Sequence, residues 1–296
     1  MSWLDIMNRV IDYIEEHLTK EIDMDEIATL STYSSVTFQR MFSIVCNITL
    51  SEYIRRRKLT MAAFDLLNSN EKIIDIAAKY GYDSPEAFAR AFKSIHGISP
   101  SLARHKGNLL ITHPRLSFQL QLKGDVPMNY RIEEKEAFTV YGIERVVSMK
   151  DGNNFIECPS LWQEIVSNGM YQKLIDSTHL PMGQDGINLA NAIDCYRDTG
   201  KESFPYMIFA FKTEKSETKD YTVITVPAAT WAVFKSDFHT MEGTSDAIQN
   251  LIKRVYSEWL PTAGYRKVEQ FEMELTYKEG DKFYSEIWIR VTPIEK

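Results

Sequence analysis

Apolar and polar residues follow the period of an α-helix through the first third of the chain. Residues 3–18 place apolar side chains on one face and acidic ones on the other, which predicts an amphipathic helix. A short helix is expected over residues 26–30. Ser34 or Ser35 caps a longer one that runs to about Val45.

This helical pattern occurs twice, because residues 26–56 reappear as residues 75–105. The matching positions are Glu26-Ile27-Ala28 with Asp75-Ile76-Ala77, Tyr33 with Tyr82, Phe38-Gln39-Arg40-Met41-Phe42 with Phe88-Ala89-Arg90-Ala91-Phe92, and Ile48 with Ile98. Each copy fits a short helix, a tight turn and a second helix. That is the helix-turn-helix, whose second helix can enter the DNA major groove. A duplicated unit favours one fold and one kind of partner for both copies.

The second copy carries clear signals for where its helix begins and ends. Gly81 supplies a permissive turn residue, Ser84 and Pro85 start the helix, and Gly97 ends it. Between the copies, residues 50–69 predict one long helix. Such a spacer can hold two recognition helices in successive major grooves, about 34 Å apart.

The candidate DNA contacts are the polar residues that leave the apolar stripe of each second helix. In the first copy, Thr37, Gln39 and Arg40 are expected to point outward. Gln and Arg can pair with purine edges, and Arg can also clamp phosphate. In the second copy Arg90 is the main candidate, because Glu86 would repel phosphate. The alternative is a plain solvated helix face, and the recurrence of the geometry counts against it.

Charge and composition support this interpretation only when the chain is divided. The whole chain carries a net charge of −7, but residues 27–106 hold eleven Lys and Arg against six Asp and Glu. Cys46, Cys158 and Cys195 are far apart and show no metal-binding spacing, so neither a disulfide framework nor a zinc site is supported. We expect a reduced, soluble, cytoplasmic protein without a membrane segment, metal or cofactor.

Residues 3–107 resemble the tandem helix-turn-helix domain of the AraC/XylS family of transcription regulators. The phrases that carry the resemblance are Tyr53-Ile54-Arg55-Arg56-Arg57-Lys58-Leu59, Ile76-Ala77-Ala78-Lys79-Tyr80-Gly81-Tyr82, Phe88-Ala89-Arg90-Ala91-Phe92-Lys93 and Gly97-Ile98-Ser99-Pro100-Ser101. Two residues depart from the family: Val36 stands where close relatives carry Trp, and Ala103 replaces the usual Tyr.

The resemblance maps the family's two recognition helices to residues 35–42 and 84–92. It implies that the chain binds double-stranded operator or promoter DNA, acts as an activator and has RNA polymerase as a partner. The resemblance and the outward-facing polar residues together give one set of candidate DNA contacts. These are Ser35, Val36, Thr37, Gln39, Arg40, Arg55, Ser84, Glu86 and Arg90.

From residue 129 the pattern changes from helical to alternating. Strands are expected over residues 130–132, 138–147, 186–196, 205–211, 269–277 and 283–291, helices over 160–174 and 243–259, and a hairpin-like region over 221–235 that turns at Pro227. This series indicates an α+β domain with two pseudo-symmetric β-α-β-β halves and a cleft between them. The predicted organisation is an all-α tandem helix-turn-helix domain over residues 1–107, a linker over 108–128 that contains a strand at 116–122, and the α+β domain over 129–296.

The last part of the chain resembles the GyrI-like effector-binding domain over residues 129–293. The phrases are Trp231-Ala232-Val233-Phe234, Val255-Tyr256-Ser257-Glu258-Trp259-Leu260-Pro261, Phe271-Glu272-Met273-Glu274 and Glu286-Ile287-Trp288-Ile289-Arg290-Val291. The resemblance implies a small-molecule effector in an aromatic cleft, where a glutamate meets a cation.

Glu274 is the first candidate for that glutamate and Glu272 the second. Both alternate with the apolar Phe271, Met273, Leu275 and Tyr277, which would face the core. The aromatic residues that could form the walls of the cleft are Trp162, Tyr206, Trp231, Trp259 and Trp288, although core packing is the alternative for each.

The leading hypothesis is a transcription regulator that binds DNA through its first third and senses a small amphipathic, aromatic or cationic molecule through the rest. A second hypothesis makes the last domain a hydrolase, but the sequence shows no Ser/His/Asp or Cys/His constellation and no catalytic residue is assigned. A third makes it a module that docks on another protein.

Overall fold

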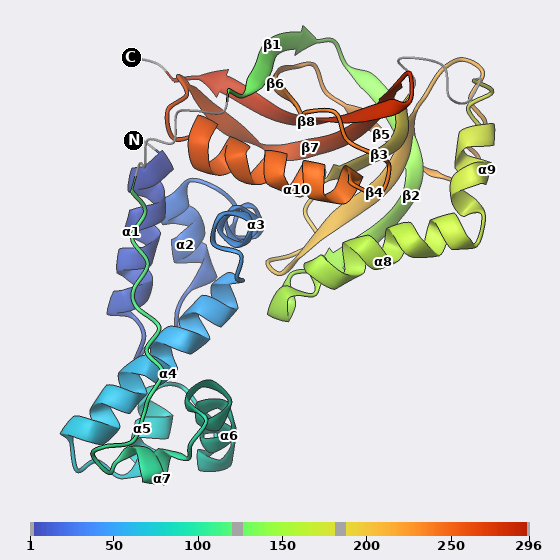
Figure 1. The fold of residues 1–296 in the computed structure, drawn as a ribbon. Helices are drawn as coiled ribbons and strands as arrows, with labels where there is room; N and C mark the ends of the chain where they lie inside the picture. The colour runs from blue at the N-terminus through green and yellow to red at the C-terminus, as the bar shows by residue number, and fades with distance from the viewer. Residues whose placement is uncertain (1–2, 120–126, 181–187, 295–296) are drawn as a thin grey trace. The chain divides into compact units, whose positions relative to one another are not determined.

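The computed structural model describes residues 3–119, 127–180 and 188–294, and contacts between residues divide the chain into two units (Figure 1). The first unit comprises Met1–Phe38 and Ile48–Gln119, and the second comprises Gln39–Asn47 and Leu120–Lys296. Helix α3 (Ser35–Cys46) therefore begins in the first unit, and residues 39–47 belong to the second. No helix among the described residues is both long and apolar enough to span a membrane.

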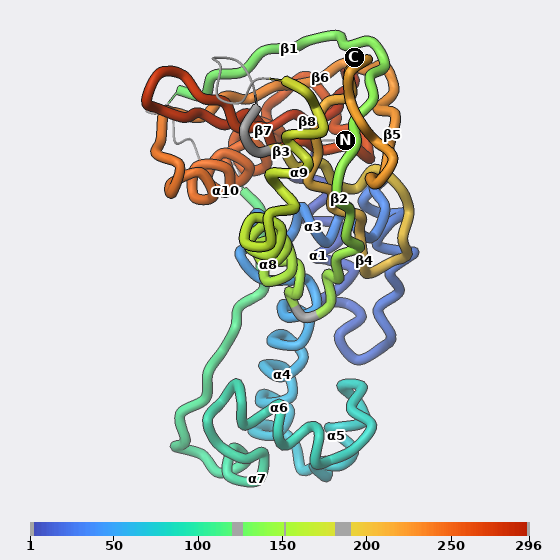
Figure 2. The backbone as a smooth tube through the Cα atoms, turned by 90° about the vertical axis from the view of Figure 1, so that its right-hand side faces the viewer, coloured from blue at the N-terminus to red at the C-terminus, as the bar shows by residue number. Residues whose placement is uncertain are grey.

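The first unit is helical, and the predicted helices are confirmed. Its elements are α1 (Trp3–Glu16), α2 (Met24–Ser31), the start of α3, α4 (Leu50–Asn68), α5 (Ile73–Lys79), α6 (Pro85–His96) and α7 (Pro100–Ala103). Figure 2 shows α4 as the single long helix that leads from the first helices to α5, α6 and α7. Side chains at the predicted stripe positions of α6, Phe88 and Phe92, are fully buried in the core around α4.

The turns of the two helix-turn-helix copies share a left-handed residue at the equivalent position. The turn residue of the second copy, Gly81, has φ +80°, and the equivalent residue of the first copy, Thr32, has φ +61°. Local caps fix the helices that follow or precede these turns. Ser84 accepts a hydrogen bond from the Ala87 N–H, and Gly97 ends α6 in the left-handed region, as the sequence predicts.

The predicted strand at residues 116–122 is wrong for residues 116–119, and residues 120–122 lie outside the described part. The segment is held by side chains rather than by a neighbouring strand. The Asn8 side chain of α1 accepts a hydrogen bond from the Phe118 N–H and donates one to the Phe118 carbonyl, each at 2.8 Å. The Tyr53 hydroxyl accepts a hydrogen bond from the Leu116 N–H. These side chains satisfy the backbone groups that a strand partner would otherwise pair with.

The second unit is built around one antiparallel sheet with strand order β1-β6-β8-β7-β3-β4-β2-β5. The strands are β1 (Asn129–Lys135), β2 (Phe138–Ser148), β3 (Asn188–Asp194), β4 (Ser203–Phe211), β5 (Thr222–Val226), β6 (Ala229–Lys235), β7 (Tyr265–Glu279) and β8 (Lys282–Pro293). A short 3₁₀ turn (Lys150–Gly152) and helices α8 (Asn154–Ser167) and α9 (Met170–Asp176) follow β2. Helix α10 (Thr244–Arg254) continues into a π-helical turn (Val255–Trp259) and contacts β8.

The hairpin predicted to turn at Pro227 is wrong. Strands β5 and β6 do not pair with each other: β5 pairs with β2, whereas β6 pairs with β1 and β8. Both strands nevertheless contribute to one core, because Val226 of β5 and Trp231 of β6 are fully buried in the same apolar cluster. Pro227 lies in the break between the two strands, which then pair with different neighbours.

The two faces of β7 differ as the alternation predicts. Phe271, Met273 and Leu275 lie in the apolar cluster, together with Trp231 and Trp288, and Tyr277 packs against it. Residues at even positions of β7 project to the other face, where the helices lie, and Thr276 and Glu274 line a cavity there. The apolar face therefore builds the core, and the polar face is free to build a site.

Exchanging the turn residues of the two helix-turn-helix copies is expected to have unequal effects. Gly81→Thr should lower the free energy of unfolding by about 1–2 kcal/mol, because a Cβ at positive φ approaches the following carbonyl oxygen. Thr32→Gly removes that clash from the first copy and should not lower stability. Urea unfolding followed by far-ultraviolet circular dichroism measures both. A greater loss for Thr32→Gly than for Gly81→Thr would contradict the shared conformation.

Candidate ligand-binding site

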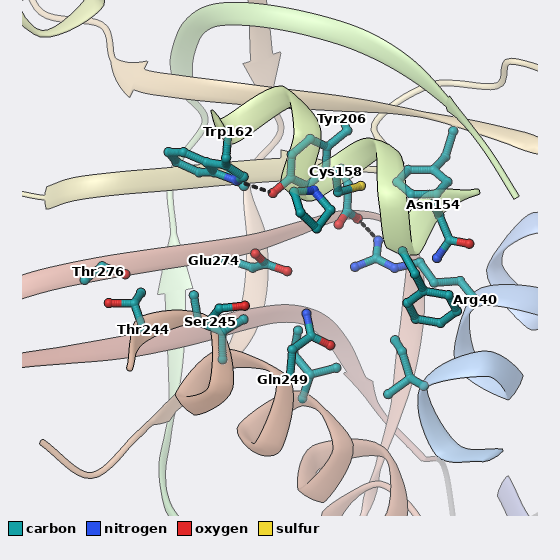
Figure 3. Close-up of a pocket in the computed structure, with 18 of the residues that line it drawn as sticks. Arg40, Asn154, Cys158, Trp162, Tyr206, Thr244, Ser245, Gln249, Glu274 and Thr276 are labelled. Atoms are coloured by element: carbon teal, nitrogen blue, oxygen red, sulfur yellow. Dashed lines mark hydrogen bonds and ion pairs between the residues drawn. The ribbon is translucent and has the colours of Figure 1, made fainter. Parts of the chain in front are cut away.

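A cavity of about 610 Å³ lies on the polar face of the sheet in the second unit (Figure 3). Strands β3, β4 and β7 form its floor, helices α8 and α10 form two walls, and the part of α3 that belongs to this unit closes one end. Its lining residues are Arg40, Ile44, Asn154, Phe155, Cys158, Pro159, Trp162, Ala192, Asp194, Phe204, Tyr206, Met241, Glu242, Thr244, Ser245, Ile248, Gln249, Ile252, Glu274 and Thr276.

Glu274 brings a carboxylate to the floor of this cavity. The side chain is partly buried, and no described residue donates a hydrogen bond to it or forms an ion pair with it. Burial, reinforced by the nearby charge of Asp194, raises the pKa of Glu274 to about 7, although Arg40 opposes this shift. The carboxylate is therefore poised to ionise more fully when a cation enters.

Aromatic side chains stand beside Glu274. Trp162 of α8 donates its indole N–H to the Tyr206 hydroxyl at 2.8 Å, which fixes both rings in the cavity wall. Burial raises the pKa of Tyr206 well above its usual range, so its hydroxyl stays protonated. Phe155 and Phe204 add two further rings. A carboxylate among rings is the environment that holds a delocalised cation.

A second acidic group, Asp194, lies at the end of β3 and pairs with Arg40. The Arg40 guanidinium also approaches the Glu272 carboxylate at 3.4 Å and lies 5.4 Å from the centre of the Phe204 ring. Burial raises the pKa of Asp194 above its usual range, and Arg40 counteracts that effect. The interaction places a buried positive charge at one end of the cavity.

Glu272 is the best-compensated of the three acids. Its carboxylate forms an ion pair with the Lys267 ammonium and accepts a hydrogen bond from the Tyr256 hydroxyl, both at 2.8 Å. Burial alone would raise the pKa of Glu272, but Lys267 and Arg40 outweigh that effect and lower it to about 2. Glu272 is thus a fixed structural anion and does not line the cavity.

The backbone around these acids is unusual. Cys195, directly after Asp194, has φ +54°, and two consecutive residues of β7, Gln270 and Phe271, have φ +65° and +57°. The β7–β8 pairing shifts between Lys267 and Glu272 at this point, which brings the ammonium of Lys267 back to the carboxylate. Non-glycine residues at positive φ cost free energy and gather where a structure holds a site in place.

The predicted ligand residues are only partly brought together. Trp162, Tyr206 and Glu274 line the cavity, as expected of site residues. Trp231 and Trp288 instead lie in the apolar core on the opposite face, and Trp259 packs against Phe234 at 4.9 Å. None of these three tryptophans lines the cavity.

Sequence reasoning missed Asp194 and the polar residues of α10, namely Thr244, Ser245 and Gln249. The signal for Asp194 was an acid inside an apolar strand pattern, but nothing local tied that strand to Glu274. The pairing of β3 with β7, which sets Ala192 opposite Glu274 and Asp194 opposite Glu272, provides that link.

Comparisons with known proteins agree with this architecture. Residues 128–292 match the model of the GyrI-like small molecule binding domain. The chain belongs to this family. Residues 27–106 match a helix-turn-helix domain, so the chain is an AraC-type DNA-binding regulator with a GyrI-like small-molecule-binding domain.

Two curated relatives and one solved structure are similar to parts of this chain. The HTH-type transcriptional activator AarP of Providencia stuartii is 40% identical over 116 residues, which are 38% of this chain and 86% of AarP. The regulatory protein SoxS of Salmonella typhimurium is 40% identical over 106 residues, which are 36% of this chain and 99% of SoxS. A bacterial transcription regulation protein from Staphylococcus aureus superposes with a TM-score of 0.43 and 15% identity over 56% of this chain and 99% of that one.

In the AraC-type regulator, the predicted DNA contacts of the first copy are less exposed than expected. Thr37 and Arg40 were predicted to point outward, and this orientation is wrong: Thr37 accepts a hydrogen bond from the Ser34 hydroxyl, and Arg40 pairs with Asp194. Gln39 donates to the Lys201 carbonyl at 3.0 Å. Ser35 is buried, and Val36 is half-buried.

The remaining predicted contacts lie in the first unit. Ser84 caps α6, and Glu86 and Arg90 of α6 are exposed. Arg55 of α4 is held by the Glu52 carboxylate and by the Ser94 hydroxyl. DNA contact by any of these residues stays a prediction, and Arg90 is the one among them whose positive charge is both exposed and on a recognition helix.

Stability of the GyrI-like domain is expected to depend on the ionisation of Glu274. Its pKa is higher in the folded chain, about 7, than the ordinary value of 4.5, so the protonated group leaves the fold at full stability below pH 4.5 and that contribution is lost as the pH rises through 7. Glu274→Gln should therefore match the wild type near pH 4 and exceed its free energy of unfolding by about 1–3 kcal/mol near pH 8. Urea unfolding of the full chain, followed by tryptophan fluorescence, measures this. An identical difference at both pH values would contradict the assigned pKa.

Proposed function

We propose that this regulator binds an aromatic or amphipathic cation at Glu274 and changes its DNA binding in response. The main support for this proposal is that the Glu274 carboxylate lines a cavity of about 610 Å³ and has no hydrogen-bond or ion-pair partner among the described residues. A ligand changes DNA binding only if it has different affinities for the DNA-competent and DNA-incompetent arrangements.

A positive charge on the ligand follows from the state of the carboxylate. Because burial raises the pKa of Glu274 to about 7, ionising it in the empty cavity is unfavourable near neutral pH. A bound cation compensates that charge, and the rings of Trp162, Tyr206 and Phe155 supply a surface over which the charge can spread. The cavity size is typical of small-molecule sites, which range over about 300–1,000 Å³.

We further propose that the GyrI-like domain consists of two pseudo-symmetric halves. Order β6-β8-β7 on one side of the sheet mirrors order β2-β4-β3 on the other. The antiparallel pairing of β7 with β3 lies at their junction, and Glu274 and Asp194 come from these two strands. The ligand then sits where the halves meet. We take the domain boundaries as residues 1–107 and 129–296 around a linker, which the matches over 27–106 and 128–292 support.

On the DNA side, we propose that α6 inserts into the major groove and that Arg90 contacts bases or phosphates. The candidate contacts of α3 act together with it. RNA polymerase is the proposed protein partner, in keeping with a role as an activator. We favour binding over catalysis, since the curated relatives AarP and SoxS are regulators.

Glu274→Gln is expected to weaken binding of a fluorescent aromatic cation, rhodamine 6G, by tenfold or more while DNA binding persists. Ionisation of Glu274 also predicts that the wild-type affinity for the dye rises as the pH passes about 7, and that this rise vanishes in the variant. Fluorescence anisotropy of the full-length protein measures both effects. Glu279→Gln, which changes an exposed carboxylate of the same strand outside the cavity lining, is the matched control and should keep wild-type affinity. Equal dye affinity in Glu274→Gln and wild type would overturn the site.

Arg90→Ala is expected to weaken binding to a specific operator fragment by about 1–3 kcal/mol, because a bidentate contact to a base edge is worth that much. Gel-shift titrations over a range of salt concentrations measure the loss. Lys93→Ala, which removes an exposed charge from the same helix, is the control. A loss that is equal on specific and random DNA would assign Arg90 to phosphate, not bases.

A further inference from the structure

The guanidinium of Arg40 occupies a small cage within the second unit, to which residues 39–47 belong. Asp194 pairs with it, Glu272 lies 3.4 Å away, and the Phe204 ring centre lies 5.4 Å from its central carbon. Only 11% of the Arg40 side chain and 2% of the Asp194 side chain are exposed. The cage therefore surrounds a planar cation with an aromatic face and two carboxylates.

The charges of the cage show that Asp194 depends on this arginine. Glu272 already receives Lys267, whose side chain is only 1% exposed, and the Tyr256 hydroxyl. Among the described residues, Arg40 is the one cation that pairs with Asp194. Removing the guanidinium would leave a buried carboxylate without a counter-charge, which is strongly unfavourable.

The cage is continuous with the ligand cavity. Arg40, Asp194 and Phe204 line the same space as Glu274, and Figure 3 shows Arg40 and Glu274 within one pocket. A molecule that enters beside Trp162 can therefore extend to Asp194. Arg40 reaches the same carboxylate from α3 on a flexible side chain, so it can give way without any change of the sheet.

We propose that Asp194 is a second cation subsite of this cavity, that it accepts guanidinium or amidinium groups, and that Arg40 is its built-in occupant in the absence of such a ligand. This inference rests on the proposed ligand-binding function. It names the chemical group that the ligand would place at Asp194. A planar cation can pair with the carboxylate and still lie over the Phe204 ring, as Arg40 does. An effector with an aromatic body and an amidinium or guanidinium end would satisfy Glu274 and Asp194 together.

Competition with benzamidine, an aromatic amidine, tests the subsite in the full-length protein. Isothermal titration calorimetry should show benzamidine binding at least tenfold more tightly to Arg40→Ala than to the wild type, because the occupant is gone. The double variant Arg40→Ala/Asp194→Asn should lose that gain, whereas Arg40→Ala/Glu274→Gln should keep most of it. Arg254→Ala removes an arginine that pairs with Glu258 outside the cavity, and it should behave like the wild type.

Equal benzamidine affinity in the wild type and Arg40→Ala, or an Asp194→Asn change that leaves the gain intact, would overturn the proposal. If Arg40→Ala does not fold, Arg40→Gln keeps a polar side chain without the charge and carries the same expectation. Rhodamine 6G binding to wild type and Glu274→Gln, measured in parallel, reports on the proposed function alone. Dye binding that depends on Glu274 without any effect of Arg40→Ala on benzamidine would reject only the second subsite.

Discussion

Three carboxylates on one face of a sheet share two positive charges, and this imbalance organises the GyrI-like domain. Lys267 compensates Glu272 and Arg40 compensates Asp194, whereas Glu274 has no cation of its own among the described residues. A buried charge without a partner is costly, so the pKa of Glu274 is raised to about 7. The carboxyl group therefore gains or loses its proton near neutral pH. In the proposed function, the ligand supplies the cation that Glu274 lacks.

The same strand alternation produces both the core and this imbalance. Odd positions of β7 fill the apolar cluster with Phe271, Met273 and Leu275, so the even positions must face the helices. Two consecutive residues at positive φ, Gln270 and Phe271, interrupt the strand and let Lys267 reach Glu272. The positive-φ residues therefore lie beside the Lys267–Glu272 charge pair, next to the strand position of Glu274.

The sequence predicted the helices of the first unit well because their signals are local, whereas the helix expected over residues 160–174 is two helices, 154–167 and 170–176. Caps such as Ser84, the turn at Gly81 and apolar stripes lie within a few residues of what they determine. Strand partners and the face that each tryptophan occupies are not local. Pro227 marked the break between β5 and β6 but could not show that these strands pair elsewhere, and Trp288 carried no sign that its face was the core. Asp194 became recognisable only when β3 paired with β7.

Arg40 is subject to two demands that one guanidinium cannot meet together. Its place on the second helix of a helix-turn-helix makes it a candidate for DNA contact, and its place in the second unit makes it the counter-charge of Asp194. If a ligand takes Asp194, the side chain becomes available; if DNA takes the side chain, Asp194 becomes available. If released Arg40 contacts DNA, linkage requires that these effects be equal in free energy: a cation that frees Arg40 would then strengthen DNA binding by the amount that DNA strengthens cation binding.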